Sequence, residues 1–130
     1  MSPRYAVQFH AVPALLNDLE ERGLLATTMV LAFGEMGRTP KANLAKYGRE
    51  HWAPAQFVLV AGGGFKAGQV IGATDKDAAY VKDREYRVAS LGKTIYHLLG
   101  LDPDHELHGA DGRPLKLITE DVPLIKEALA

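Results

Sequence analysis

Apolar residues recur with a helical period in two stretches of the chain, at spacings close to i, i+3, i+4 and i+7. The first stretch precedes Gly23 and comprises Val12, Leu15, Leu16 and Leu19. The second precedes Gly100 and comprises Leu91, Ile95, Leu98 and Leu99. Glycine is common immediately beyond a helix C-terminus, where the backbone turns left-handed. The pattern therefore predicts two amphipathic helices, each ending at one of these glycines.

Two further runs, residues 27–33 and 56–61, are mostly apolar, have the length of a strand, and are each followed by glycine. Unbroken apolar runs are typical of strands covered on both faces, as in parallel sheets. Weaker patterns predict a short strand or hairpin arm at 69–72, an edge strand at 115–118 and a closing helix at 123–129. Helices and strands interspersed in this way indicate an α/β fold: a partial parallel or mixed sheet flanked by helices. At 130 residues, we expect a single domain.

Residues 38–54 show no sustained period and hold two prolines, which predicts a long loop. Loops of this length within a domain are often functional. Glu35 and Arg38 stand where the first predicted strand ends, and Arg49 and His51 stand near the end of the loop. Ligands of open α/β sheets gather beyond the carboxyl ends of strands. These four residues are therefore the candidate site.

Glu35 and His51 are candidate metal ligands, because a carboxylate with an imidazole suits zinc or manganese. Arg38 and Arg49 are candidate anion-binding residues, because a guanidinium matches the paired oxygens of phosphate or sulfate. Other roles stay open. Glu35 can accept hydrogen bonds from loop amides or pair with Arg38, and both arginines can tie the loop to carboxylates or backbone carbonyls. Trp52 is interpreted as a packing anchor rather than a platform for substrate.

The composition of the chain argues against several kinds of binding partner and reactive group. The formal net charge is −1 and no long basic run is present, so nucleic acid is not expected as a partner. No apolar stretch reaches the length needed to cross a bilayer or forms the core of a secretory signal, so no membrane association is expected. The chain has no cysteine, which excludes a thiolate nucleophile and a cysteine-based zinc site.

Two other motifs have ordinary explanations. The glycine-rich segment 62–68 is followed by a strand-like rather than a helical pattern, so a dinucleotide-binding loop is rejected in favour of a turn. A cluster of histidines and aspartates lies in a segment rich in turn residues, which indicates a solvated turn: Asp102, Asp104, His105, His108 and Asp111.

Three segments together resemble the C-terminal part of the bacterial domain-of-unknown-function family 1501: GEMGRTP at 34–40, GREHW at 48–52 and AGGGFKAGQVIGATD at 61–75. The resemblance covers residues 14–130, whereas residues 1–13 look divergent. That family in turn resembles the alkaline phosphatase and sulfatase superfamily, whose members hydrolyse phosphate and sulfate esters with two metal ions. The resemblance implies that Glu35 and His51 stand at metal-ligand positions. Met36 stands where the superfamily has a metal-binding histidine.

The resemblance also implies missing parts. The superfamily uses an upstream serine or threonine nucleophile and further metal ligands, and residues 1–26 offer no match for them. We therefore expect a C-terminal fragment of a metal-dependent hydrolase, with no catalytic residue of its own. Its expected partner is the missing N-terminal half or a second copy of the chain, since unpartnered strands would leave apolar surface exposed. The alternative is a stand-alone structural or interaction module without enzymatic activity.

Overall fold

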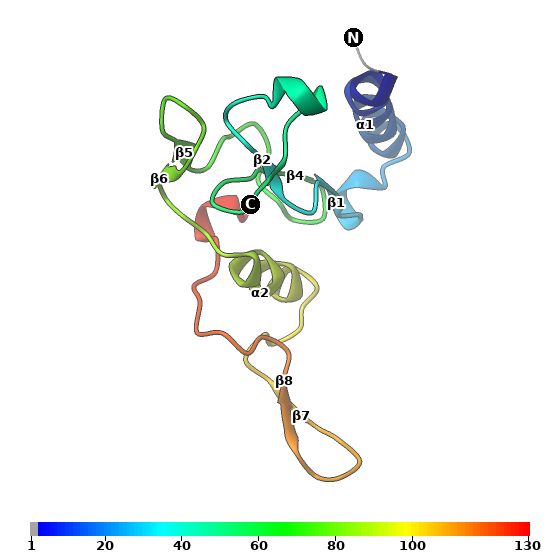
Figure 1. Cartoon of the computed structure of the whole chain (residues 1–130). Helices are drawn as coiled ribbons and strands as arrows, with labels where there is room; N and C mark the ends of the chain where they lie inside the picture. The colour runs from blue at the N-terminus through cyan, green and yellow to red at the C-terminus, as the bar shows by residue number, and fades with distance from the viewer. Residues whose placement is uncertain (1–2) are drawn as a thin grey trace. The chain divides into compact units, whose positions relative to one another are not determined.

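The computed structural model describes residues 3–130, which contain two α-helices and a set of short strands (Figure 1). The predicted combination of helices and strands is therefore confirmed at this level. The chain divides into two compact units. The first runs to Arg84 and includes Ala130, and the second comprises Glu85–Leu129.

The first unit begins with helix α1 (Pro3–Glu21), followed by a single 3-10 turn at Leu25–Thr27. Gly23 has a φ of 70°, and its amide donates to the carbonyl of Glu20 at 2.9 Å. The next amide, that of Leu24, donates to the carbonyl of Leu19 at 2.8 Å. These bonds satisfy carbonyls that the end of the helix leaves free. The predicted helix end is thus confirmed, while the helix starts earlier than its apolar stripe.

Strand β1 (Val30–Phe33) pairs antiparallel with β4 (Val58–Ala61), so that Phe33 lies opposite Val58. Within residues 3–130 the strands form four two-stranded sheets, and all of their pairings are antiparallel. A parallel or mixed sheet is not found in this part of the chain. The expectation that these strands are covered on both faces was wrong, since every residue of β1 and β4 is half-buried or exposed.

The glycine-rich segment forms the turn after β4. Gly62 and Gly63 have positive φ values of 67° and 56°. A Cβ atom on Gly62 would lie 2.3 Å from the carbonyl oxygen of Thr28 and 2.5 Å from that of Leu25. The amide of Gly63 donates to the same Leu25 carbonyl at 2.9 Å. Glycine is therefore required here for close backbone packing, which agrees with the turn inferred from sequence.

The predicted long loop is largely organised. Strands β2 (Gly37–Arg38) and β3 (His51–Trp52) pair antiparallel, and a 3-10 turn at Leu44–Lys46 lies between them. Downstream, β5 (Ala73–Thr74) pairs with β6 (Val81–Asp83). The strand predicted at 69–72 is absent, and β5 begins directly after it.

The second unit is built on helix α2 (Val88–Leu98), whose end before Gly100 was predicted correctly. Its fully buried side chains are polar: Ser90 is 1% exposed and Thr94 is 0% exposed. The Thr94 hydroxyl donates to the Ser90 carbonyl at 2.7 Å and accepts from the Ile125 amide at 3.0 Å. A β7–β8 hairpin and a 3-10 turn complete the unit, at Glu106–His108, Pro114–Lys116 and Lys126–Ala128. The predicted edge strand is thus present, and the closing helix is a single turn.

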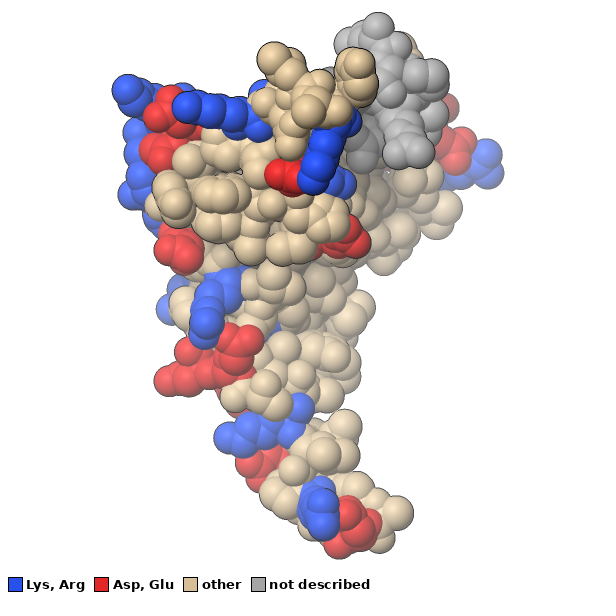
Figure 2. Space-filling model, in the orientation of Figure 1, with Lys and Arg blue, Asp and Glu red and all other residues tan. Residues whose placement is uncertain are grey.

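Charged side chains of both signs lie next to one another on the face shown in Figure 2. Several form exposed ion pairs, such as Arg22 with Asp18 and Arg87 with Glu120. Among the helices of residues 3–130, none combines the length and the apolar character needed to cross a bilayer.

Candidate functional site on the β2–β3 strand pair

The β2–β3 pair determines where the candidate residues lie. Arg38 is the register partner of His51, and Gly37 is the partner of Trp52. A Cβ atom on Gly37 would lie 1.7 Å from the carbonyl oxygen of Ala55, well inside contact distance. The chain can therefore fold back after β3 against β2 only because residue 37 is glycine. Glu35 precedes β2 in the turn that follows β1.

This arrangement brings the two predicted metal ligands together. Nε2 of His51 lies 2.8 Å from Oε1 of Glu35, a contact that is an ion pair when the imidazole is protonated. The side chains are 51% and 70% exposed, so both donors are accessible from solvent. No group of three or more histidine, cysteine, aspartate or glutamate residues suited to a metal occurs within residues 3–130. Glu35 and His51 thus form a pair of possible ligands, to which the described residues add no third.

The two arginines differ in their contacts. The Nη1 atom of Arg49 donates to the carbonyl of Thr39 at 2.6 Å and also to that of Pro40. Arg49 therefore ties the end of the loop to its beginning, as one of the two sequence interpretations expected. Arg38 is exposed, and its guanidinium makes no hydrogen bond or ion pair with any residue that the structure describes. Of the two, Arg38 is the one available to an anion.

Hydrogen bonds across the loop hold its two sides together. The amide of Thr39 donates to the carbonyl of Glu50 at 3.0 Å, and the amide of Glu50 donates to the Thr39 hydroxyl at 3.2 Å. Lys46 pairs with the Glu50 carboxylate. This pairing lowers the pKa of Glu50 and raises the pKa of Lys46, chiefly through their hydrogen bond and then through charge attraction. The loop that carries His51 is thus ordered by its own contacts.

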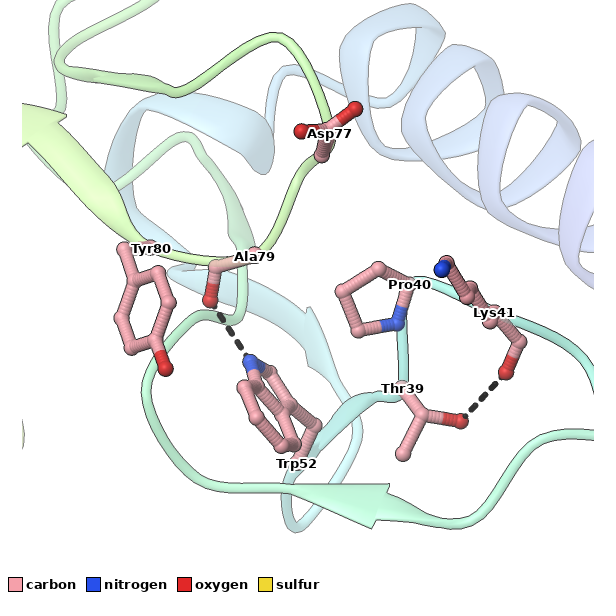
Figure 3. Close-up of a pocket in the computed structure, with 7 residues that line it drawn as sticks. All are labelled: Thr39, Pro40, Lys41, Trp52, Asp77, Ala79 and Tyr80. Carbon is pink, nitrogen blue, oxygen red and sulfur yellow. Dashed lines mark hydrogen bonds between the residues drawn. The ribbon is translucent and has the colours of Figure 1, made fainter.

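Next to this loop lies a pocket of about 610 Å³, with Trp52 and Tyr80 among its lining residues (Figure 3). The indole Nε1 of Trp52 donates to the carbonyl of Ala79 at 2.6 Å. The interpretation of Trp52 as an anchor therefore agrees with its half-buried position and its bond. The pocket was not predicted from the sequence, because Asp77 and Tyr80 lie far from Trp52 along the chain and belong to no motif.

A model of one protein family matches residues 8–129, nearly the whole chain. The chain belongs to the DUF1501 family, whose members are described as proteins of unknown function. The family resemblance inferred from the three motifs is confirmed. Comparisons with curated proteins and with solved structures gave no match.

The residues of the site therefore indicate which chemistry this DUF1501 chain can support. Glu35 and His51 offer one carboxylate and one imidazole at hydrogen-bonding distance, with the unpaired guanidinium of Arg38 beside His51 in the strand register. Such a set can share a divalent cation and attract an anion next to it. It lacks the third and fourth protein ligands of a tight metal site.

Proposed function

We propose that this DUF1501 chain contributes one part of a metal-dependent phosphate- or sulfate-ester hydrolase site. In this proposal Glu35 and His51 bind one divalent cation, zinc or manganese, and Arg38 binds the anionic ester oxygens. The observation that carries the proposal is the 2.8 Å approach of His51 to Glu35, two exposed side chains that lie far apart in sequence.

The two donors fit a metal ion in type and position. Ligand atoms of a tetrahedral zinc site lie about 3.3 Å apart, given bonds of roughly 2.0–2.1 Å. The observed 2.8 Å therefore requires only a small displacement of two solvent-exposed side chains. A bound divalent cation would supply Lewis-acid polarisation of the ester oxygen. Arg38 would orient the same group through its guanidinium, and Arg49 would keep the loop in place through its bonds to two backbone carbonyls.

The proposal includes a further segment that completes both the site and the sheet. Two ligands do not make a tight site, so the remaining ligands and the nucleophile would come from a missing N-terminal half, and this chain alone would not be catalytic. The chain would then correspond to the C-terminal portion of an alkaline phosphatase- or sulfatase-like domain. The exposed apolar side chains of the β1–β4 pair support this, because a two-stranded sheet is rarely stable without a covering layer. Met36 would leave a second metal position without a good ligand, since a thioether binds hard cations poorly.

A stand-alone interaction module is the second candidate. The exposed apolar side chains, which include Phe33 at 59% and Phe57 at 83% exposure, support this candidate as much as the first. In this candidate a second copy of the chain covers them. Sedimentation of the purified chain separates the two candidates. A stable dimer that Phe33→Glu dissociates supports the module, whereas a monomer at all concentrations contradicts it.

The test of the metal proposal is a calorimetric titration with zinc and with manganese. We expect weak but saturable binding by the native chain, as suits a two-ligand site, and its loss in both Glu35→Ala and His51→Ala. His105→Ala is the matched control, because His105 is also an exposed histidine but lies in the second unit. Absence of binding, or binding that depends on His105, would refute the metal role of Glu35 and His51.

A further inference from the structure

The pocket beside the loop is a hollow, partly open to solvent, that lies apart from the candidate metal ligands. Its lining includes three ring side chains, those of Pro40, Trp52 and Tyr80, together with the charged residues Lys41 and Asp77. Its volume of about 610 Å³ lies within the range of small-molecule sites. Successive residues of a strand point to opposite faces, so Trp52 and its neighbour His51 face opposite sides of β3. The pocket is therefore distinct from the candidate metal ligands.

The aromatic walls are held in a definite arrangement. The ring centroids of Trp52 and Tyr80 lie 5.8 Å apart with an interplanar angle of 68°. Nε1 of the indole already donates to the carbonyl of Ala79, so the indole offers a ligand ring surface rather than a free N–H donor. Figure 3 shows Tyr80 and Pro40 on either side of Trp52. A ligand in this pocket would meet ring surfaces on more than one side.

The charges of the lining indicate which kind of ligand fits. Lys41 and Asp77 bring one charge of each sign, and neither side chain forms a hydrogen bond or ion pair with another residue described in the structure. A cationic ligand would be attracted by Asp77 and repelled by Lys41, and an anionic ligand the reverse. A neutral ligand with hydroxyl groups uses both, because the ammonium donates hydrogen bonds and the carboxylate accepts them.

We propose that this pocket binds a neutral sugar ring, such as one hexose unit of a polysaccharide. The apolar C–H face of the ring would pack on Trp52 and Tyr80, as aliphatic groups pack on aromatic faces. Its hydroxyl groups at the ring edge would bond to Lys41 and Asp77. The proposal uses none of the candidate metal ligands, so either proposal can fail without the other.

The experiment uses Trp52, the single tryptophan of the chain, as the reporter. Cellopentaose and maltopentaose are titrated into the full chain while tryptophan fluorescence is recorded, with choline and phenyl phosphate as cationic and anionic comparison ligands. We expect a saturable change with at least one oligosaccharide and weaker binding of both charged ligands. Tyr80→Ala should weaken oligosaccharide binding by about tenfold, because it removes one aromatic wall.

Matched variants complete the test. Tyr47→Ala removes a tyrosine that is 97% exposed and lies outside the pocket, and it should leave binding unchanged. Lys41→Met and Asp77→Asn should each weaken oligosaccharide binding by severalfold, and Glu35→Ala should have no effect. The proposal is overturned if neither oligosaccharide gives a saturable change, if choline or phenyl phosphate binds more tightly, or if Tyr80→Ala binds as well as Tyr47→Ala.

Discussion

The β1–β4 pair of the first unit and helix α2 of the second reverse the usual relation between polarity and burial. The eight residues of β1 and β4 are all apolar, yet none of them is fully buried. In α2 the two residues with the least exposure, Ser90 and Thr94, carry hydroxyl groups. An apolar strand is therefore buried only where a neighbouring helix or sheet packs against it.

The two regions also differ in the contacts that stabilise them. The turn that follows β4, at Gly62–Gly64, packs closely on the backbone of Leu25 and Thr28, which precede β1. In the second unit the Thr94 hydroxyl joins α2 to the segment before the last 3-10 turn through the Ile125 amide. This difference can be tested by substitution, because the first region should depend on its turn and the second on one buried hydroxyl.

We expect Gly62→Ala to lower the free energy of unfolding more than any other variant discussed below. The new Cβ would lie 2.3 Å from a backbone oxygen, at a φ of 67° that L-residues disfavour. We expect a loss of about 3 kcal/mol or more in the free energy of unfolding, measured by urea denaturation. Gly68→Ala is the control for the strain alone, since its φ is 74° and no atom lies within 4 Å of its Cβ position. Equal losses in both variants would contradict the importance of the close packing.

Thr94→Val should lower the free energy of unfolding by a smaller amount. The substitution keeps the shape of the side chain but leaves the Ile125 amide without its acceptor. An unsatisfied donor costs about 1–3 kcal/mol when it is fully buried, and the cost should lie at the lower end here because the bond is part-buried. Thr94→Ser retains the hydroxyl and should lose less stability. Thermal denaturation monitored by circular dichroism compares the two variants, and a Thr94→Val protein as stable as Thr94→Ser would show that the hydrogen bond contributes little.

Leu59→Ala should change the stability of the isolated chain by less than about 1 kcal/mol, because this β4 side chain is already 40% exposed. The same urea measurement applies. A loss of several kcal/mol would mean that the β1–β4 pair is covered in solution, for example by a second copy of the chain. The Leu59 variant therefore tests directly whether these strands lack a covering layer.

The smallest effect on stability is expected for the exposed ion pair of Lys46 and Glu50. Lys46→Ala should raise the lowered pKa of Glu50 toward its ordinary value, as measured by an NMR titration of the carboxyl carbon. Because folding lowers this pKa, the pair stabilises the fold above the ordinary carboxyl pKa, and the contribution disappears as the pH falls through the lowered value. Lys41→Ala, which removes an unpaired lysine, should leave the Glu50 titration unchanged.

Several features followed from the sequence alone. The helix ends before Gly23 and Gly100 and the positions of β1 and β4 were predicted, because periodicity and glycine conformation act over a few residues. Membership of the DUF1501 family followed from motifs that occupy short segments. Glu35 was selected by residue type and by its place at a predicted strand end, and His51 by residue type and by its place in the predicted loop. The family resemblance pointed to the same two residues.

The tertiary structure decided which segments meet. It brought His51 to 2.8 Å from Glu35, assigned Arg49 to backbone carbonyls, and placed Tyr80 against Trp52. It also paired β1 with β4 antiparallel and left both strands partly exposed. These outcomes depend on contacts between residues far apart in the chain, and on which layers are present to cover an apolar face. Local sequence patterns describe one segment at a time, so they can identify the apolar strands and the polar candidates but not their neighbours in the folded protein.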